Sequence, residues 1–213
     1  MPLANPDLTE FTTASQAVVS YDWFDLSAQT GFRDLYLGKT VDADVISNIA
    51  WYSNEIDTMT SVDVTDFTQK TDYDFDITFA AATTLKGAAI LNISHAITVS
   101  GSTENNSYII AKVRHWDGTT ETELVANQSD TLTSSSDGQY SQANAIDLEI
   151  PETVFAVGET LRVTIEQWVK RASGGNQQAW LGHDPKNRGV SATLDWGTTP
   201  TMAVLQTPFK IDQ

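Results

Sequence analysis

The chain has no cysteine, so it can form no disulfide and can offer no thiolate to a metal ion. Basic residues are also scarce: 12 Lys and Arg stand against 28 Asp and Glu, which gives a formal net charge of −16. An acidic surface of this kind repels phosphate backbones, and we therefore predict that the protein does not bind nucleic acid.

Long apolar runs are missing as well. No stretch approaches the roughly 18 consecutive apolar residues of a membrane helix, which predicts no membrane partner. The opening residues Met1–Asp7 lack both the basic and the apolar region of a secretion signal. We therefore expect a protein that is made in the cytoplasm and either stays there or leaves by another route, such as assembly into a particle.

Helical periodicity over three turns is absent, and no internal repeat has a fixed period, which argues against helix bundles, propellers and solenoids. The chain has instead 28 Thr and 17 Ser, which favour strands and turns respectively. About ten to twelve short β-type runs follow one another closely. This spacing predicts an all-β fold, an antiparallel β-sandwich of jelly-roll type. We expect residues 14–213 to form one sandwich domain after an N-terminal arm, residues 1–13.

Two runs alternate clearly between apolar and polar residues. Residues 159–170 form the most regular strand, and residues 72–79 place aromatic side chains on one face and Asp72, Asp74 and Asp76 on the other. The dipeptide Asp117-Gly118 lies between two β-type runs and predicts a hairpin. Polar composition predicts long loops over residues 127–141 and 172–188, and the short strand over residues 145–150 is expected to stop at Pro151.

Catalytic patterns are absent from this sequence. Its three histidines are scattered, none stands in a zinc-binding pattern, and there is no G-x-S-x-G motif. Asp72, Asp74 and Asp76 resemble the start of a calcium loop, but Ile77 and Thr83 occupy the positions that require Gly and Glu. We favour a solvated Asp face over a cation site or subunit contact, and we predict no catalytic residue, no cofactor and no metal.

One surface is marked as a candidate for interaction. Trp168 shares its strand face with Arg162, Thr164, Glu166 and Lys170, and exposed aromatic residues on soluble strands commonly mark protein contacts. The only basic concentration in the chain flanks the loop at residues 172–188. Trp168, Lys170, Arg171, Lys186 and Arg188 are therefore the predicted interaction residues. A further hypothesis is that this basic concentration meets the acidic segment at residues 40–85 of another subunit.

The C-terminal block resembles a known group of proteins. The residues that carry the resemblance are Glu159–Val163, Trp180–Arg188, Leu194 and Pro208–Asp212, and residues 14–20 and 30–36 are similar more loosely. Together they look like the virion structural proteins of tailed bacteriophages. The resemblance implies a jelly-roll module and carries over no catalytic residue.

On that resemblance, the expected function is structural: a capsid decoration or cement protein located in the virion. The implied partners are the major capsid protein or other virion proteins, and the chain itself is expected to form a homo-oligomer, with a trimer favoured. A tail, collar or fibre-associated module is the first alternative. A carbohydrate-binding β-sandwich is a further alternative, and a β-sandwich glycan hydrolase is the last.

Overall fold

The computed structural model describes residues 30–100, 104–134, 136–172, 177–189 and 194–210. These residues form twelve strands and no helix. The strands are β1 (Thr30–Lys39), β2 (Asp44–Ser47), β3 (Asp57–Ser61), β4 (Thr68–Thr78), β5 (Thr83–Val99), β6 (Asn105–Trp116), β7 (Glu121–Gln128), β8 (Leu132–Ser134), β9 (Gly138–Phe155), β10 (Thr160–Arg171), β11 (Gln178–Gly182) and β12 (Ala203–Lys210). The predicted all-β sandwich is confirmed in class and in strand number. Within the described ranges, no helix is long and apolar enough to span a membrane.

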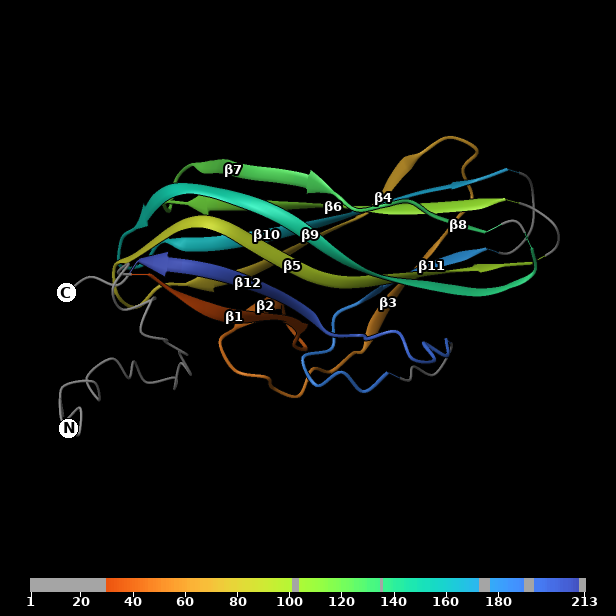
Figure 1. The fold of residues 1–213 in the computed structure, drawn as a ribbon, viewed down its shortest axis with the longest axis horizontal. Coiled ribbons are helices and arrows are strands. Elements are labelled where there is room, and N and C mark those ends of the chain that lie inside the picture. Colours follow the sequence, from red (N-terminus) through yellow and green to blue (C-terminus); the bar gives the residue numbers. More distant parts are fainter. Residues whose placement is uncertain (1–29, 101–103, 135, 173–176, 190–193, 211–213) are drawn as a thin grey trace.

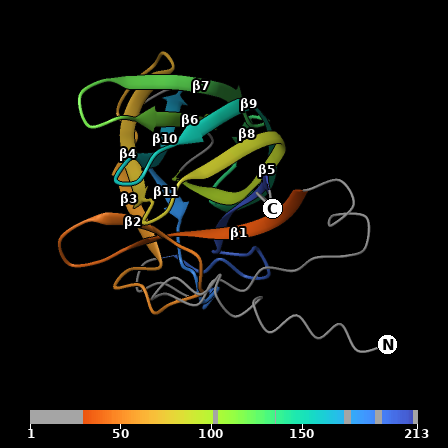
Figure 2. The ribbon, with the colours of Figure 1, turned by 90° about the vertical axis from the view of Figure 1, so that its left-hand side faces the viewer.

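Hydrogen bonds join the strands into one unclosed sheet that folds into two layers (Figures 1 and 2). One layer contains β9, β5, β12 and β1, and β11 and β3 continue it along the second half of β5. The other layer contains β4, β10 and β6, with β7 and β8 sharing the far edge of β6. Strand β2 joins the layers: it pairs antiparallel with β1 and parallel with β4 through Val45 and Asp76. The sheet is therefore mixed rather than purely antiparallel.

The main core lies between the layers, where alternate side chains of each strand point inward. In β10 the inward series is Leu161, Val163 and Ile165, each fully buried. In β4 the predicted aromatic face contributes Phe75, which is 1% exposed, with Tyr73 and Ile77 packed beside the core. The two alternations read from the sequence therefore give the correct inward faces.

The prediction of one long polar loop over residues 127–141 is wrong. Strand β7 runs to Gln128, β8 occupies residues 132–134, and β9 begins at Gly138. Thr and Ser occur in strands as well as in turns, so their abundance in residues 127–141 did not distinguish a strand from a turn. The loop predicted for residues 172–188 is also wrong in part, because β11 lies inside it and pairs on both sides, with β3 and β5.

Strand β9 also continues past the predicted stop at Pro151, as far as Phe155. Its pairing with β5 shifts register at this point: Ile150 is opposite Gly87 and Thr153 is opposite Leu85. Proline lacks a backbone N–H, and a bulge on an edge strand is a place where that loss is tolerated. The Asp117-Gly118 hairpin is confirmed, with Gly118 at φ 97° joining β6 to β7. The predicted arm, residues 1–13, lies outside the described residues.

Candidate interaction site on the outer face of β4, β10 and β6

The structure does not gather the predicted basic residues into one cluster. Lys170 and Arg171 end β10, where the Arg171 Nη2 donates to the Asp63 carbonyl at 3.3 Å. Lys186 and Arg188 follow β11, whose first residue pairs with Ser61 and whose last pairs with Asp57. The length of β11 therefore separates the two basic pairs. Whether these residues contact a partner stays a prediction.

Asp184 organises the loop that holds Lys186 and Arg188. Its side chain is fully buried and accepts hydrogen bonds from the backbone N–H of Lys186 at 3.1 Å and of Arg188 at 2.6 Å. The Arg188 guanidinium also donates to both carboxylate oxygens, each at 3.0 Å. These bonds raise the pKa of Arg188, the largest cause being the side-chain bond to Asp184. Arg188 is thus tied to its own loop, and it also lies over the ring of Tyr52, 4.4 Å from its centroid.

Lys170 and Trp168 lie on the outer face of β10, together with an ion network. At the other end of this face, Arg162 donates to both oxygens of Asp76 at 2.8 Å and to Glu121 at 2.8 Å. It also forms an ion pair with Asp74 at 3.2 Å. Arg114 contributes a further pair with Glu121 at 2.6 Å. The register explains these contacts, since Asp76, Arg162 and Arg114 stand opposite one another on three adjacent strands.

The predicted solvated Asp face is therefore largely an ion-paired face. Asp74 accepts a hydrogen bond from the Thr164 hydroxyl at 2.6 Å, and Asp76 is bound by Arg162. Asp72 is exposed and has no ion-pair partner among the described residues. Burial raises the pKa of Asp72, and the negative charges of Asp74 and Glu166 raise it further. The positive charges of Arg114 and Lys112 act in the opposite direction and lower it. In the described part of the chain, no three acidic or histidine side chains are grouped so as to hold a metal ion.

Glu166 links Lys112 to the aromatic residues. Its side chain is only 7% exposed, and it forms an ion pair with Lys112 on β6. Its second oxygen accepts a hydrogen bond from the Trp168 indole at 3.0 Å. Burial would raise the pKa of Glu166, but the bonds from Lys112 and Trp168 outweigh burial and lower it. Glu166 is therefore an anion that fixes the edge of the Trp168 ring.

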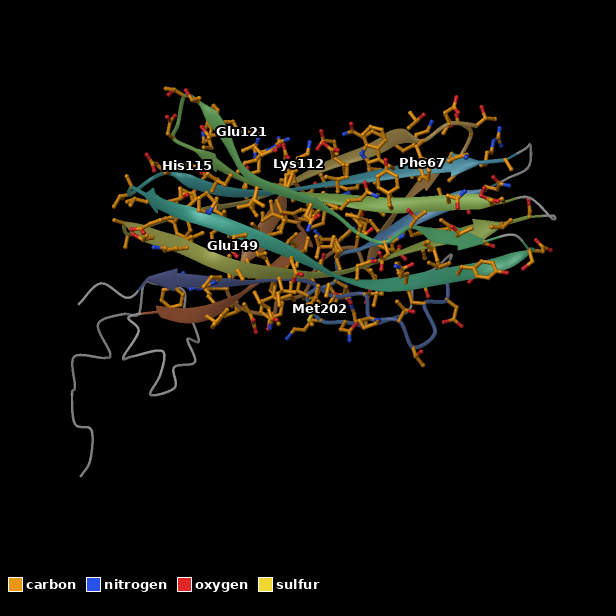
Figure 3. The ribbon with its side chains drawn as sticks, turned by 45° about the horizontal axis from the view of Figure 1, so that its top comes forward. Phe67, Lys112, His115, Glu121, Glu149 and Met202 are labelled. Atoms are coloured by element: carbon orange, nitrogen blue, oxygen red, sulfur yellow. The ribbon has the colours of Figure 1, made fainter. Side chains whose placement is uncertain are left out.

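Three aromatic rings follow one another beside this anion, and we call Phe67, Tyr108 and Trp168 the aromatic strip. Tyr108 stacks on Trp168 with centroids 6.1 Å apart and planes at 10°. Phe67 lies 4.8 Å from Tyr108, and the Lys170 ammonium lies 5.7 Å from the Phe67 centroid. Figure 3 shows Phe67, Lys112 and Glu121 along one face of the sandwich, with Phe67 toward one end and Glu121 toward the other.

Sequence reasoning singled out Trp168 and Lys170 but missed Phe67, Tyr108 and Lys112. Tyr108 and Lys112 lie on β6 directly opposite outward-facing residues of β10, Trp168 and Thr164. Knowledge of how the two strands pair would therefore have identified them. Phe67 precedes β4 in a turn and carried no signal. Two other tryptophans, Trp180 and Trp196, are each 1% exposed and belong to the interior.

The histidines give no catalytic arrangement among the described residues. His95 is fully buried, with Nε2 3.1 Å from the Ser107 carbonyl and Nδ1 3.0 Å from the Asn144 amide. His115 pairs with Glu159 at 2.8 Å. His183 Nε2 lies 2.8 Å from the Thr58 hydroxyl, but its buried Nδ1 has no hydrogen-bond partner. A Thr–His pair of this kind lacks the third group that orients the imidazole in hydrolytic triads.

Comparison with known proteins adds a fold likeness. No family model and no curated protein sequence matches the chain. Among solved structures, two crystal structures of a CocE/NonD family hydrolase from Staphylococcus aureus are similar at 14% and 12% identity, covering 85% and 84% of this chain, each with a TM-score of 0.49. An aminopeptidase from a marine sediment Thaumarchaeota archaeon is similar at 8% identity over 84% of this chain, with a TM-score of 0.54. The chain spans 37% of the hydrolase and 36% of the aminopeptidase.

The aminopeptidase structure corrects the function expected from sequence. The expectation of a capsid decoration protein, with its tail-module and carbohydrate-binding alternatives, is wrong, because the solved structure that resembles the chain with a TM-score of 0.54 is an aminopeptidase. At this identity the aminopeptidase shows the fold alone: a β-sandwich that makes up about a third of a longer chain. The C-terminal resemblance, the predicted trimer and the predicted partners remain untested predictions.

Proposed function

We propose that this chain is a non-catalytic accessory module that docks onto another protein through the aromatic strip of Phe67, Tyr108 and Trp168. The observation that carries the proposal is the fixed position of the Trp168 ring, which is bound at its edge by Glu166 and stacked on Tyr108. A ring that is already ordered loses little conformational entropy when a partner covers it. Trp and Tyr are also the residue types that most often dominate interface energies.

The chemistry around the strip defines the partner. The strip offers an apolar centre, and the exposed Asp72 beside it has no ion-pair partner among the described residues. The chain as a whole, at −16, attracts cationic surfaces over longer range. We therefore propose a partner surface with an apolar centre and at least one Lys or Arg placed to meet Asp72.

Support for an accessory role comes from the fold and from the histidines. The similar aminopeptidase contains this sandwich as 36% of its length, so the fold occurs there as one part of a larger enzyme. In this chain, no described histidine has both a nucleophile and an orienting acid as partners. We propose that any hydrolytic activity linked to the chain belongs to the partner. Turnover of ester or aminoacyl-peptide substrates by the purified chain alone would contradict this.

Docking can be tested with a helix-locked peptide that presents Leu and Arg on one face. A locked helix cannot pair with a strand edge, so it reports on the outer face of β4, β10 and β6 alone. Fluorescence anisotropy should show binding that Trp168→Ala weakens by about tenfold or more, as expected for an interface anchor. Tyr52→Ala is the matched control, since Tyr52 is an aromatic residue that is 70% exposed and lies between β2 and β3, outside the aromatic strip. Equal losses in both variants would contradict the proposal.

A further inference from the structure

Strand β9 has a long free edge. Among the described residues it pairs with β5 alone, over residues 138–155, and no ladder joins its other side. Strand β7 lies beside that side in both ribbon views, yet the two strands contact without backbone pairing (Figures 1 and 2). Unpaired strand edges present rows of N–H and C=O groups that can accept another strand.

One hydrogen bond shows which backbone groups face the free edge. The side-chain amide of Asn127, on β7, donates to the Asp147 carbonyl at 2.9 Å. In an antiparallel ladder the N–H and C=O of one residue point the same way, and alternate residues share that direction. Ala143, Ala145 and Asp147 therefore direct their main-chain groups away from β5. The Asn127 amide stands where a neighbouring strand would place its own N–H.

A groove runs along this edge and has room for a main chain. It has a volume of about 270 Å³ and is lined by residues 127–130 and 142–147. Its polar walls include the side-chain amides of Asn127, Gln128, Gln142 and Asn144. Ala143 and Ala145 are exposed and small, so a strand could approach the edge without a steric barrier.

The charge on this edge has one sign. Residues 117–159, which contain β7, β8 and β9, include nine Asp or Glu and no Lys, Arg or His. Among these acids, Glu123, Asp130, Asp147 and Glu149 form no ion pair with the described residues. Asp130 and Asp147 line the groove itself. A second copy of this chain would bring the same acids into contact, so charge disfavours self-pairing and favours a basic occupant.

We infer that the free edge of β9 binds an extended, Lys- or Arg-bearing segment of a partner protein as an added strand. The segment's main chain pairs with Ala143 and Ala145, next to the Asp147 carbonyl that the Asn127 amide occupies. Its cations lie on the outer side, where Asp147 and Glu149 are exposed, and its polar side chains face the amides of the groove. This site is separate from the aromatic strip and does not depend on it.

The test uses a labelled peptide of about eight residues in which Lys alternates with Thr, a length typical of strands. Wild-type protein should bind it, and N-methylation of alternate peptide nitrogens should weaken binding by about tenfold or more, because lost main-chain bonds add up. Ala145→Pro removes one N–H from the free edge and none from the β5 ladder, so it should give a similar loss. Trp168→Ala should change the affinity by less than about twofold.

Any one of the following four outcomes would overturn the inference. If the N-methylated peptide bound as tightly as the unmodified peptide, binding would reflect charge attraction without strand pairing. This comparison needs no protein variant. Full binding by Ala145→Pro, with thermal unfolding unchanged, would place the peptide elsewhere. Failure of the peptide to bind at about 100 μM would also count against it. Concentration-dependent dimerisation that Ala145→Pro abolishes would assign the edge to a second copy instead.

Discussion

The Trp168 indole donates a hydrogen bond to Glu166, two residues earlier on the same strand, at 3.0 Å. Residues two apart on a strand share a face, so the bond holds the ring against its own outer surface. Because Glu166 also pairs with Lys112, the aromatic ring is tied to this ion pair. The half-buried Trp168 ring is thus anchored by the buried charge of Glu166.

Glu166→Gln should lower the free energy of unfolding by about 1–3 kcal/mol, because the partly buried Lys112 ammonium loses its anion. The amide oxygen of Gln can still accept from Trp168, so the ring should keep its position. Urea unfolding measures the loss. Glu123→Gln is the matched control: Glu123 is exposed and has no ion pair in the described part of the chain, and its replacement should change stability by less than about 0.5 kcal/mol.

Asp184→Asn should cost about 2–3 kcal/mol, since this fully buried carboxylate accepts charge-assisted bonds from Arg188 as well as backbone bonds. Lys186→Ala should be nearly neutral, because the exposed Lys186 contributes its backbone N–H rather than its ammonium. Thermal unfolding of the two variants compares them. A larger loss from Lys186→Ala than from Asp184→Asn would show that this loop depends on its surface charge.

His95 should make stability depend on pH. Burial lowers the pKa of His95 to about 4. The hydrogen bond to the Ser107 carbonyl raises this pKa, but burial has the larger effect. The unfolded chain binds the proton near the ordinary pKa of 6.5, so this contribution to stability is fully present above about pH 6.5. It should fall by about 3 kcal/mol as the pH drops from 6.5 to 4.

Other groups titrate over the same range, so a variant must isolate the effect of His95. Among them is His183, whose pKa burial also lowers. His95→Gln should be less stable than wild type at neutral pH yet lose less further stability on acidification. Parallel stability curves for the two proteins between pH 6.5 and 4 would show that His95 does not carry the pH dependence.

Local patterns in the sequence were sufficient for much of the fold. The alternation through residues 159–170 and 72–79 gave the correct inward faces of β10 and β4, and Asp117-Gly118 gave the hairpin. Strands β8 and β11 and the first part of β9 were missed because Ser, Thr and Gly are common to strands and loops. The pairing of β9 with β5 spans about fifty residues of sequence, and such a register leaves no local signal.

The candidate site was predictable only in its central strand. Trp168 and Lys170 followed from the alternation of β10. Tyr108, Lys112 and Asp76 join them through the registers of β6 and β4, which a single sequence does not reveal. The two basic pairs on either side of β11 lie one strand length apart, and their contact with a partner stays a prediction.

The central claim is that the aromatic strip is a docking surface, and one comparison tests it most directly. It is the affinity of the helix-locked Leu/Arg peptide for Trp168→Ala relative to Tyr52→Ala, at physiological salt. We predict a loss of about tenfold or more for Trp168→Ala and a change of less than about twofold for Tyr52→Ala. Equal affinity of the two variants, with both folded, would contradict the claim.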